Sequence, residues 1–153
     1  MPTTPRVPPA RRVVAELAGA DYASAFTVPA TGLESRTADH WARAVVEQAP
    51  WPVRWALLTG WRGVLGLRLA PTYAPGHVLG WPVERDEPDA ITLRARSPLL
   101  LARNTVSVDG AGLTWTTRVH YERRAGRTVW AAAAQVHHRL LPFLLRRAVR
   151  RAA

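Results

Sequence analysis

Apolar residues in the N-terminal half of the chain predict one strand followed by two helices. Apolar side chains at alternate positions of residues 21–29 (DYASAFTVP) are typical of a strand with one buried face. From Thr37 the apolar spacing changes to three or four residues, which predicts a helix with Thr37 as its N-cap. This helix should end before Pro50, because a residue that precedes proline avoids the α conformation. A second helix is expected over residues 53–65, with tryptophan and leucine at helical spacing.

From His77 onward the pattern changes to short alternating runs, and each run is typical of a strand. The four runs are HVLGWPVE, AITLRAR, LLLARNTVSV and GLTWTTRVHYE. Asp109 and Gly110 separate the last two and predict a tight hairpin, and residues 124–127 (RAGR) are expected to form another turn. The next stretch, TVWAAAAQV, fits a strand or a helix. From Val136 the spacing is helical. The side chains expected to face inward are Val136, Leu140, Phe143 or Leu144, and Ala148 or Val149.

These elements predict an α+β fold in the order strand, two shorter helices, antiparallel strands and a long C-terminal helix. The sheet needs a cover for its apolar face, and the last helix is the obvious one. We expect residues 13–153 to form one domain, a length typical of a single core. Residues 1–12 hold four prolines and three arginines and are expected to be a flexible, basic tail.

The composition of the chain excludes several chemistries. It has no cysteine, which excludes disulfides, thiolate metal sites and cysteine nucleophiles. All 21 basic residues are arginine, so neither a Schiff-base lysine nor a phosphate-loop lysine exists here. We expect no transmembrane segment, because no stretch of about 20 residues is apolar and largely uncharged. The first dozen residues lack a secretory pattern, and together with the missing cysteines this favours a cytoplasmic protein.

The net charge of +10 raises nucleic acid or an anionic membrane as possible partners. Its distribution argues against a specific nucleic-acid site. Residues 13–138 carry 13 arginines against all 11 acidic residues, so the excess positive charge belongs to the two ends of the chain. We expect no specific nucleic-acid binding, and the arginine-rich ends stay open as a nonspecific contact to nucleic acid or anionic lipid.

Three segments of the chain resemble the domain-of-unknown-function 2867 family. They are DYASAF, then HWARAVVEQAPWPVRWALLTGWRGVLGL, and finally TTRVHYERRAGRTVW followed by HHRLLPFLLRR. The likeness covers roughly residues 21–147. That family is similar to the START and Bet v 1-like group, in which a curved antiparallel sheet wraps around a long C-terminal helix, the helix-grip fold. The resemblance implies this fold and, because members commonly hold an apolar ligand between sheet and helix, a small-molecule ligand. Some members are cyclases or hydrolases.

Strand parity divides residues 113–122 between two faces. The apolar face, expected to point inward, carries Leu113, Trp115, Thr117, Val119 and Tyr121. The polar atoms of this set need partners if they are buried. A cavity would supply those partners through ligand or water, and a packed core would supply them from the backbone, and both alternatives stay open here. The candidate ligand-binding residues are Trp81, Trp115, Thr117, Tyr121 and His138.

The adjacent histidines at 137 and 138 do not predict a metal site. Neighbouring side chains on a helix point about 100° apart, and the chain has no HxxxH or HxH spacing. We therefore expect no metal and no cofactor. His138 is the candidate to contact a ligand or to act as an acid or base, with Tyr121 as the second catalytic candidate. No serine lies in a GxSxG context, so no nucleophile is evident.

Three functions are therefore consistent with the sequence. The first is a binding domain for a small apolar or amphipathic molecule, with its pocket between the sheet and the C-terminal helix. The second is an enzyme of the cyclase or isomerase type on the same fold. The third is a basic protein that binds nucleic acid or an anionic membrane through its ends. The identity of the ligand and the oligomeric state do not follow from the sequence.

Overall fold

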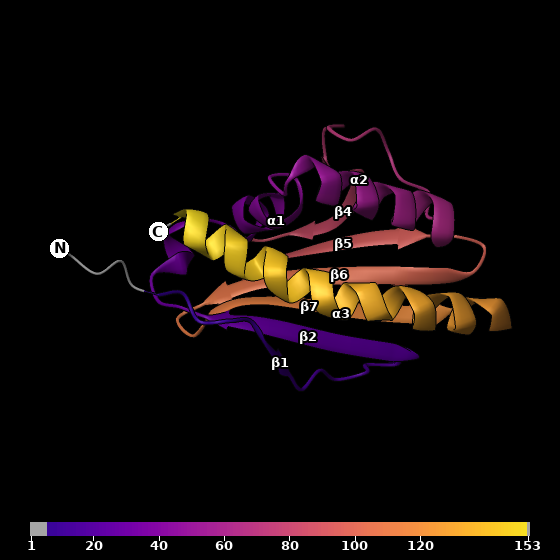
Figure 1. Ribbon diagram of the computed structural model, residues 1–153, viewed down its shortest axis with the longest axis horizontal. Coiled ribbons are helices and arrows are strands. Elements are labelled where there is room, and N and C mark those ends of the chain that lie inside the picture. The colour runs from indigo at the N-terminus through magenta and orange to yellow at the C-terminus, as the bar shows by residue number, and fades with distance from the viewer. Residues whose placement is uncertain (1–5, 153) are drawn as a thin grey trace.

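Seven antiparallel strands form one sheet, and every helix lies on the same face of it (Figure 1). The computed structural model describes residues 6–152. In the sheet the strands follow the order β1-β2-β7-β6-β5-β4-β3. The elements are β1 (Arg11–Val13), β2 (Tyr22–Pro29), η1 (Leu33–Ser35), α1 (Ala38–Val46), α2 (Trp51–Thr59), η2 (Gly60–Val64), β3 (His77–Val78), β4 (Trp81–Asp86), β5 (Ala90–Arg96), β6 (Leu100–Asp109), β7 (Gly112–Tyr121) and α3 (Arg124–Ala152).

The long helix α3 crosses the sheet diagonally, with α1 and α2 beside it (Figure 1). Contacts join α3 to β2 and β7, and join α1 to β5 and β6, so the two helices cover different halves of the sheet. The α+β fold predicted from the sequence is confirmed, with the arrangement of a helix-grip fold. All pairs of neighbouring strands are antiparallel.

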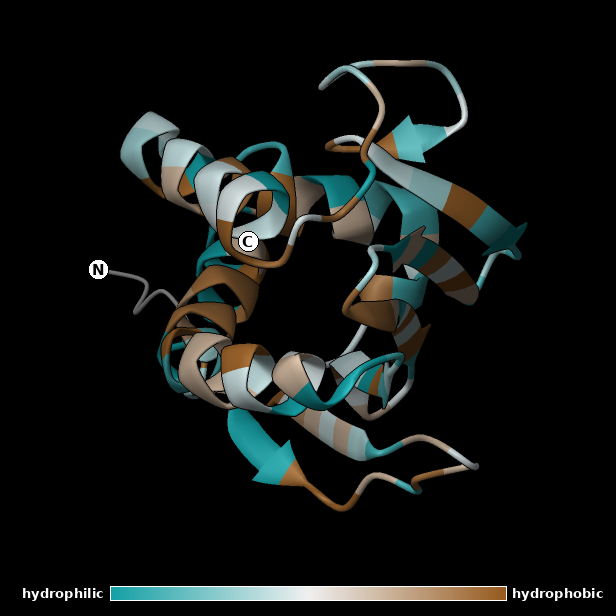
Figure 2. Cartoon of the chain, turned by 90° about the vertical axis from the view of Figure 1, so that its right-hand side faces the viewer, coloured by the Kyte–Doolittle hydropathy of each residue, from teal (hydrophilic) through white to brown (hydrophobic). Residues whose placement is uncertain are grey.

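The hairpin of β6 and β7 lies at the centre of the sheet and carries the predicted alternation. Leu113, Trp115, Thr117 and Val119 are all buried, while the residues between them are partly exposed. In Figure 2 several strands are banded, because hydropathy changes from one residue to the next along them. The predicted hairpin is also confirmed: the carboxylate of Asp109 accepts hydrogen bonds from two backbone N–H groups of the turn.

Helix α1 begins as the sequence predicts. The hydroxyl of Thr37 accepts a hydrogen bond from the backbone N–H of His40 at 3.2 Å, which satisfies one of the free donors of the first turn. Trp41 follows on the buried side, and its indole N–H donates to the backbone oxygen of Leu33 at 2.9 Å. This bond joins α1 to the connection from β2.

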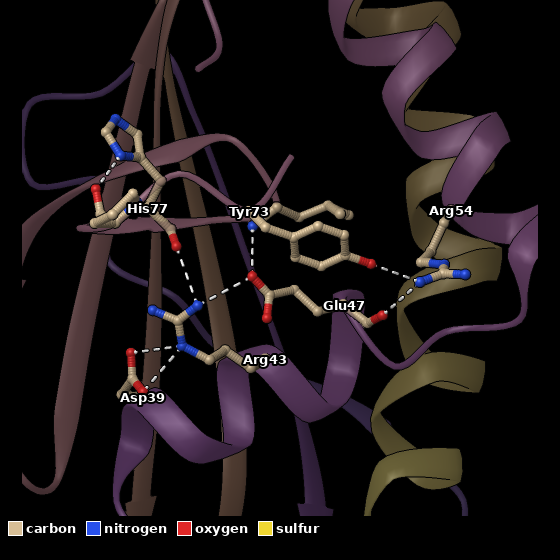
Figure 3. Close-up of polar contacts among 8 residues, drawn as sticks. Asp39, Arg43, Glu47, Arg54, Tyr73 and His77 are labelled. Atoms are coloured by element: carbon tan, nitrogen blue, oxygen red, sulfur yellow. Dashed lines mark hydrogen bonds and ion pairs between the residues drawn. The ribbon is translucent and has the colours of Figure 1, made fainter. Parts of the chain in front are cut away.

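A cluster of charged residues fixes β3 to α1 (Figure 3). Arg43 donates to the carboxylates of Asp39 and Glu47 and to the backbone oxygen of His77. The same Glu47 oxygen accepts the backbone N–H of Leu79 at 3.1 Å. Leu79 is fully buried with φ of 46°, in the left-handed region that side chains disfavour. The cluster therefore holds a strained turn in place directly before β4.

Four sequence-based boundaries need correction. Arg11 and Arg12, which we assigned to the flexible tail, belong to β1 and pair with β2, and residues 1–5 of that tail lie outside the described residues. The expected strand from His77 is divided by a tight turn into β3 and β4. The second helix begins earlier, at Trp51, and its last turns are π-helical as η2.

The largest correction concerns α3, which begins at Arg124 and not near Val136. The expected turn at residues 124–127 is the first turn of this helix, and TVWAAAAQV is helical throughout, as its alanines favour. Gly126 permits the early start. A β-carbon at this position would lie 2.3 Å from the backbone oxygen of Leu99, so only glycine fits against the β5–β6 turn.

We predict that Gly126→Ala lowers the stability of the protein. Alanine normally stabilises a helix by about 1 kcal/mol over glycine, but here the close backbone oxygen cannot move away, and overpacking costs about 1–3 kcal/mol. Urea denaturation measures the difference. Gly63→Ala in η2 is the control, because a β-carbon there meets no atom within 4 Å. A Gly126→Ala protein at least as stable as wild type would contradict the close contact.

Candidate functional site

A cavity of about 350 Å³ lies between the central strands and the helices. Its floor comes from β4, β6 and β7, one side from α2 and η2, and the other side from α3. In Figure 2 the helices lie opposite the strands of the sheet. The residues that line the cavity are Val46, Ala56, Leu57, Gly60, Trp61, Val64, Leu65, Trp81, Ala102, Asn104, Trp115, Thr117, Trp130, Ala132, Ala133, Val136, His137, Leu140, Leu141 and Leu144.

The walls of the cavity are apolar and aromatic. Trp61 of η2 meets Trp81 of β4 edge to face, with ring centroids 5.5 Å apart, and this pair closes one end of the floor. Across the cavity α3 contributes alanine and leucine side chains together with Trp130. Among the described lining residues none is an arginine, aspartate or glutamate. An ionised group placed here would therefore lack a charged partner, which is costly in an apolar interior.

A small hydrogen-bonded group lies in the floor. The side-chain oxygen of Asn104 accepts the indole N–H of Trp115 at 3.0 Å and the hydroxyl of Thr117 at 2.6 Å. All three side chains are buried. An indole N–H can only donate, so the atom that it meets must be the amide oxygen and not the nitrogen. The amide NH₂ of Asn104 is then the half of the group that is free to bond something else.

Three further polar groups of the lining have no partner. The indole nitrogens of Trp81 and Trp130 and the Nε2 atom of His137 are buried without a hydrogen bond from any described residue. A buried polar group without a partner is destabilising by about 1–3 kcal/mol. Because these three atoms have almost no accessible surface, a molecule in the cavity would bond them only if the neighbouring side chains moved.

His137 is the histidine of the cavity wall. The residue as a whole is only half-buried, but its Nε2 atom is shielded from solvent. Burial lowers the pKa of His137 to about 4, and the positive charges of His138 and Arg12 nearby act in the same direction. The ring of His137 is therefore neutral at pH 7 and can offer one nitrogen as donor and the other as acceptor.

The structure brings together three of the five predicted ligand-binding residues. Trp81, Trp115 and Thr117 line the cavity, but Tyr121 and His138 do not. His138 points from α3 toward β2, where its Nε2 atom hydrogen-bonds the hydroxyl of Tyr22. Consecutive residues of a helix diverge by about 100°, so only one of the two histidines reaches the interior, and it is His137.

Tyr121 lies at the end of β7, away from the cavity. The guanidinium of Arg127, one turn into α3, sits over its ring at 5.1 Å from the centroid. This cation–π contact ties the strand end to the start of the helix. Neither Tyr121 nor His138 is therefore placed to act on a molecule in the cavity, and both lose their role as acid or base candidates at this site.

Residues that the sequence analysis missed include Asn104, Trp130 and His137. Asn104 had a usable signal: the hairpin at Asp109 fixes the β6–β7 register, which pairs Asn104 with Thr117. No sequence signal pointed to Trp130, because its segment fitted a strand or a helix. For His137 the apolar pattern misled us, since Val136 was expected inward but is largely exposed at the rim.

Helix α2 forms the outer wall of the cavity and is held loosely. None of its residues, 51–59, is buried, although most are apolar. Trp51 and Trp55 are 73% and 66% exposed. Arg54 anchors the helix by donating to the hydroxyl of Tyr73 and to the backbone oxygen of Glu47 (Figure 3). The α2 side of the cavity therefore has no buried residue over positions 51–59, whereas the sheet side and the α3 side have several.

In the part of the chain that the structure describes, no three histidine or acidic side chains lie close enough together to hold a metal ion. Over residues 6–152, no helix combines the length and the apolar character that crossing a bilayer requires.

Comparison with known proteins gives no relative. No protein-family model matches the sequence, and no curated protein or solved structure matches the chain. The resemblance to the domain-of-unknown-function 2867 family therefore stays a prediction.

We predict that His137 makes the stability of the protein depend on pH. Its pKa is about 4 when folded and 6.5 in the unfolded chain, so only the unfolded chain binds this proton between the two values. The stabilisation is complete above pH 6.5 and is lost as the pH falls toward 4, by up to roughly 3 kcal/mol.

Urea denaturation of wild type and His137→Leu at pH 7 and pH 4.5 tests this effect. The variant should lose less stability on acidification than wild type does. His40→Gln is the control, because His40 is exposed and far from the cavity wall. Equal losses for wild type and His137→Leu would show that His137 is protonated as readily in the folded protein as in the unfolded one.

Proposed function

We propose that this protein binds a small, largely apolar molecule in the cavity between the sheet and α3. The observation that carries the proposal is an apolar cavity of about 350 Å³ whose floor holds the Asn104 amide, with its N–H groups unbonded by any described residue. Small-molecule sites are commonly apolar clefts of about 300–1,000 Å³ with a few placed polar groups. A fully packed core, which the sequence left as the alternative, would not retain such a space.

The size of the cavity limits its occupant. A cavity of about 150 Å³ accommodates one benzene ring, so a cavity of about 350 Å³ fits a molecule of about two rings. One side is open toward solvent between α2 and α3, where Val64 and Val136 are exposed at the rim. These apolar rim residues would contact a ligand that extends beyond the enclosed part.

A cyclase or isomerase reaction has less support. Acid–base catalysis needs a group whose pKa lies near the working pH and which reaches the substrate. The low pKa makes His137 a weak base, and the candidates His138 and Tyr121 lie outside the lining. The lining offers no carboxylate among its described residues.

A role of the arginine-rich ends in binding nucleic acid or anionic lipid also has less support. Arg146 donates to the backbone oxygen of Val7, and Arg147 and Arg151 donate to that of Gln48. These arginines connect α3 to the N-terminal segment and to the end of α1. These hydrogen bonds give the three arginines a structural role that requires neither nucleic acid nor lipid.

We predict that filling the cavity weakens binding of an apolar molecule. The neutral fluorophore N-phenyl-1-naphthylamine has three rings, so two can occupy the enclosed part and the third can lie at the open rim. It brightens in apolar surroundings, so titration gives its affinity directly. Ala133→Phe places a ring in the cavity, because Ala133 lines it from α3. We expect wild type to bind one equivalent and Ala133→Phe to bind at least 10-fold more weakly.

The matched control is Ala131→Phe, two residues away on the exposed side of the same helix. It adds the same ring and should bind the fluorophore as wild type does. If wild type binds nothing, or if both variants bind equally well, the proposed function is wrong. Native mass spectrometry of freshly purified wild type and Ala133→Phe would show whether a natural molecule copurifies with wild type and is lost in the variant.

A further inference from the structure

The polar group that the cavity floor leaves for a ligand is a donor. The amide oxygen of Asn104 is already occupied by Trp115 and Thr117, which leaves its two N–H groups without an acceptor from the described residues. The indole nitrogens of Trp81 and Trp130 also can only donate, but they have almost no accessible surface and would reach a ligand only if neighbouring side chains moved. A ligand that satisfies this site must therefore bring a hydrogen-bond acceptor.

The charge of the ligand follows from the same lining. No arginine lines the described cavity wall to pair with a carboxylate or phosphate, and no acidic side chain lines it to pair with an amine. Transfer of an unpaired ion into such surroundings is far more costly than transfer of a neutral polar group. An acceptor that carries no charge is what remains, and a carbonyl oxygen is the commonest such group.

Resting on the binding function proposed above, we infer that the ligand is a neutral, largely apolar carbonyl compound whose oxygen accepts a hydrogen bond from the side-chain amide of Asn104. The amide is well suited to this task, because Trp115 and Thr117 hold its oxygen and so fix the orientation of its N–H groups. A donor oriented in advance loses little conformational freedom when the ligand arrives.

The orientation of Asn104 is built into the β6–β7 hairpin. Asn104 and Thr117 are directly paired across the two strands, and Trp115 lies two residues from Thr117 on the same face. Side chains in such positions are within reach of one another. The two donors therefore reach one oxygen without any ligand present, and the amide N–H groups point to the remaining side of the group.

Benzophenone and diphenylmethane test this inference, because they share two rings and differ only in a carbonyl group in place of a methylene group. Competition against N-phenyl-1-naphthylamine gives the affinity of each for the full chain. One neutral hydrogen bond corresponds to about a 3- to 10-fold preference. We expect wild type to bind benzophenone more tightly than diphenylmethane by that factor.

Asn104→Asp at pH 8 removes the donor and keeps the shape. An ionised carboxylate still accepts from Trp115 and Thr117 but donates nothing, so the preference for benzophenone should disappear or reverse. Thr105→Val is the matched control. It removes a hydroxyl from the next residue of β6, which bonds Thr92 and does not line the cavity, so the preference should persist.

The infrared carbonyl stretch of bound benzophenone gives a readout that needs no variant to fold. In wild type we expect it at a lower frequency than in hexane, because a hydrogen bond weakens the C=O bond. A hexane-like frequency, equal binding of the two compounds to wild type, or a preference that survives in a folded Asn104→Asp protein would each overturn the inference while the binding function stands. Failure of wild type to bind either compound or the fluorophore would overturn both.

Discussion

The apolar face of the sheet must be removed from water, and the way the helices do this determines the rest of the structure. α3 covers β2 and β7, and α1 covers β5 and β6. A cylinder laid diagonally on a curved sheet cannot follow it everywhere, so the middle strands keep uncovered apolar surface between the two helices. α2 and η2 lie over that gap without filling it, and the cavity is the result.

The polar group in the floor is stable because its members satisfy one another. Asn104, Trp115 and Thr117 would each destabilise an apolar interior alone, but two donors share one oxygen. The arrangement leaves the opposite end of the amide exposed to the cavity. The hydrogen bonds that allow three polar side chains to be buried thus also orient the N–H groups of Asn104. No additional residue is needed to orient this donor.

Local rules were sufficient for β2 and for β5 to β7, for the Thr37 cap and for the inward placement of Trp115 and Thr117, because these follow from period and parity. They were insufficient on α3. The inner face of α3 has apolar residues both where it packs on the core and where it meets the rim of the cavity. The apolar pattern of the sequence therefore did not distinguish His137 from His138. The early start of α3 depends on Gly126 fitting against Leu99, a contact between distant elements that no local pattern contains.

The absence of any buried residue in α2, over residues 51–59, has a thermodynamic consequence. A helix gains most of its stability from a packed apolar face, and α2 has such a face toward the cavity with little to pack on. A molecule in the cavity would supply that missing surface. Occupancy of the cavity and ordering of α2 are then linked equilibria: whatever favours one favours the other by the same free energy.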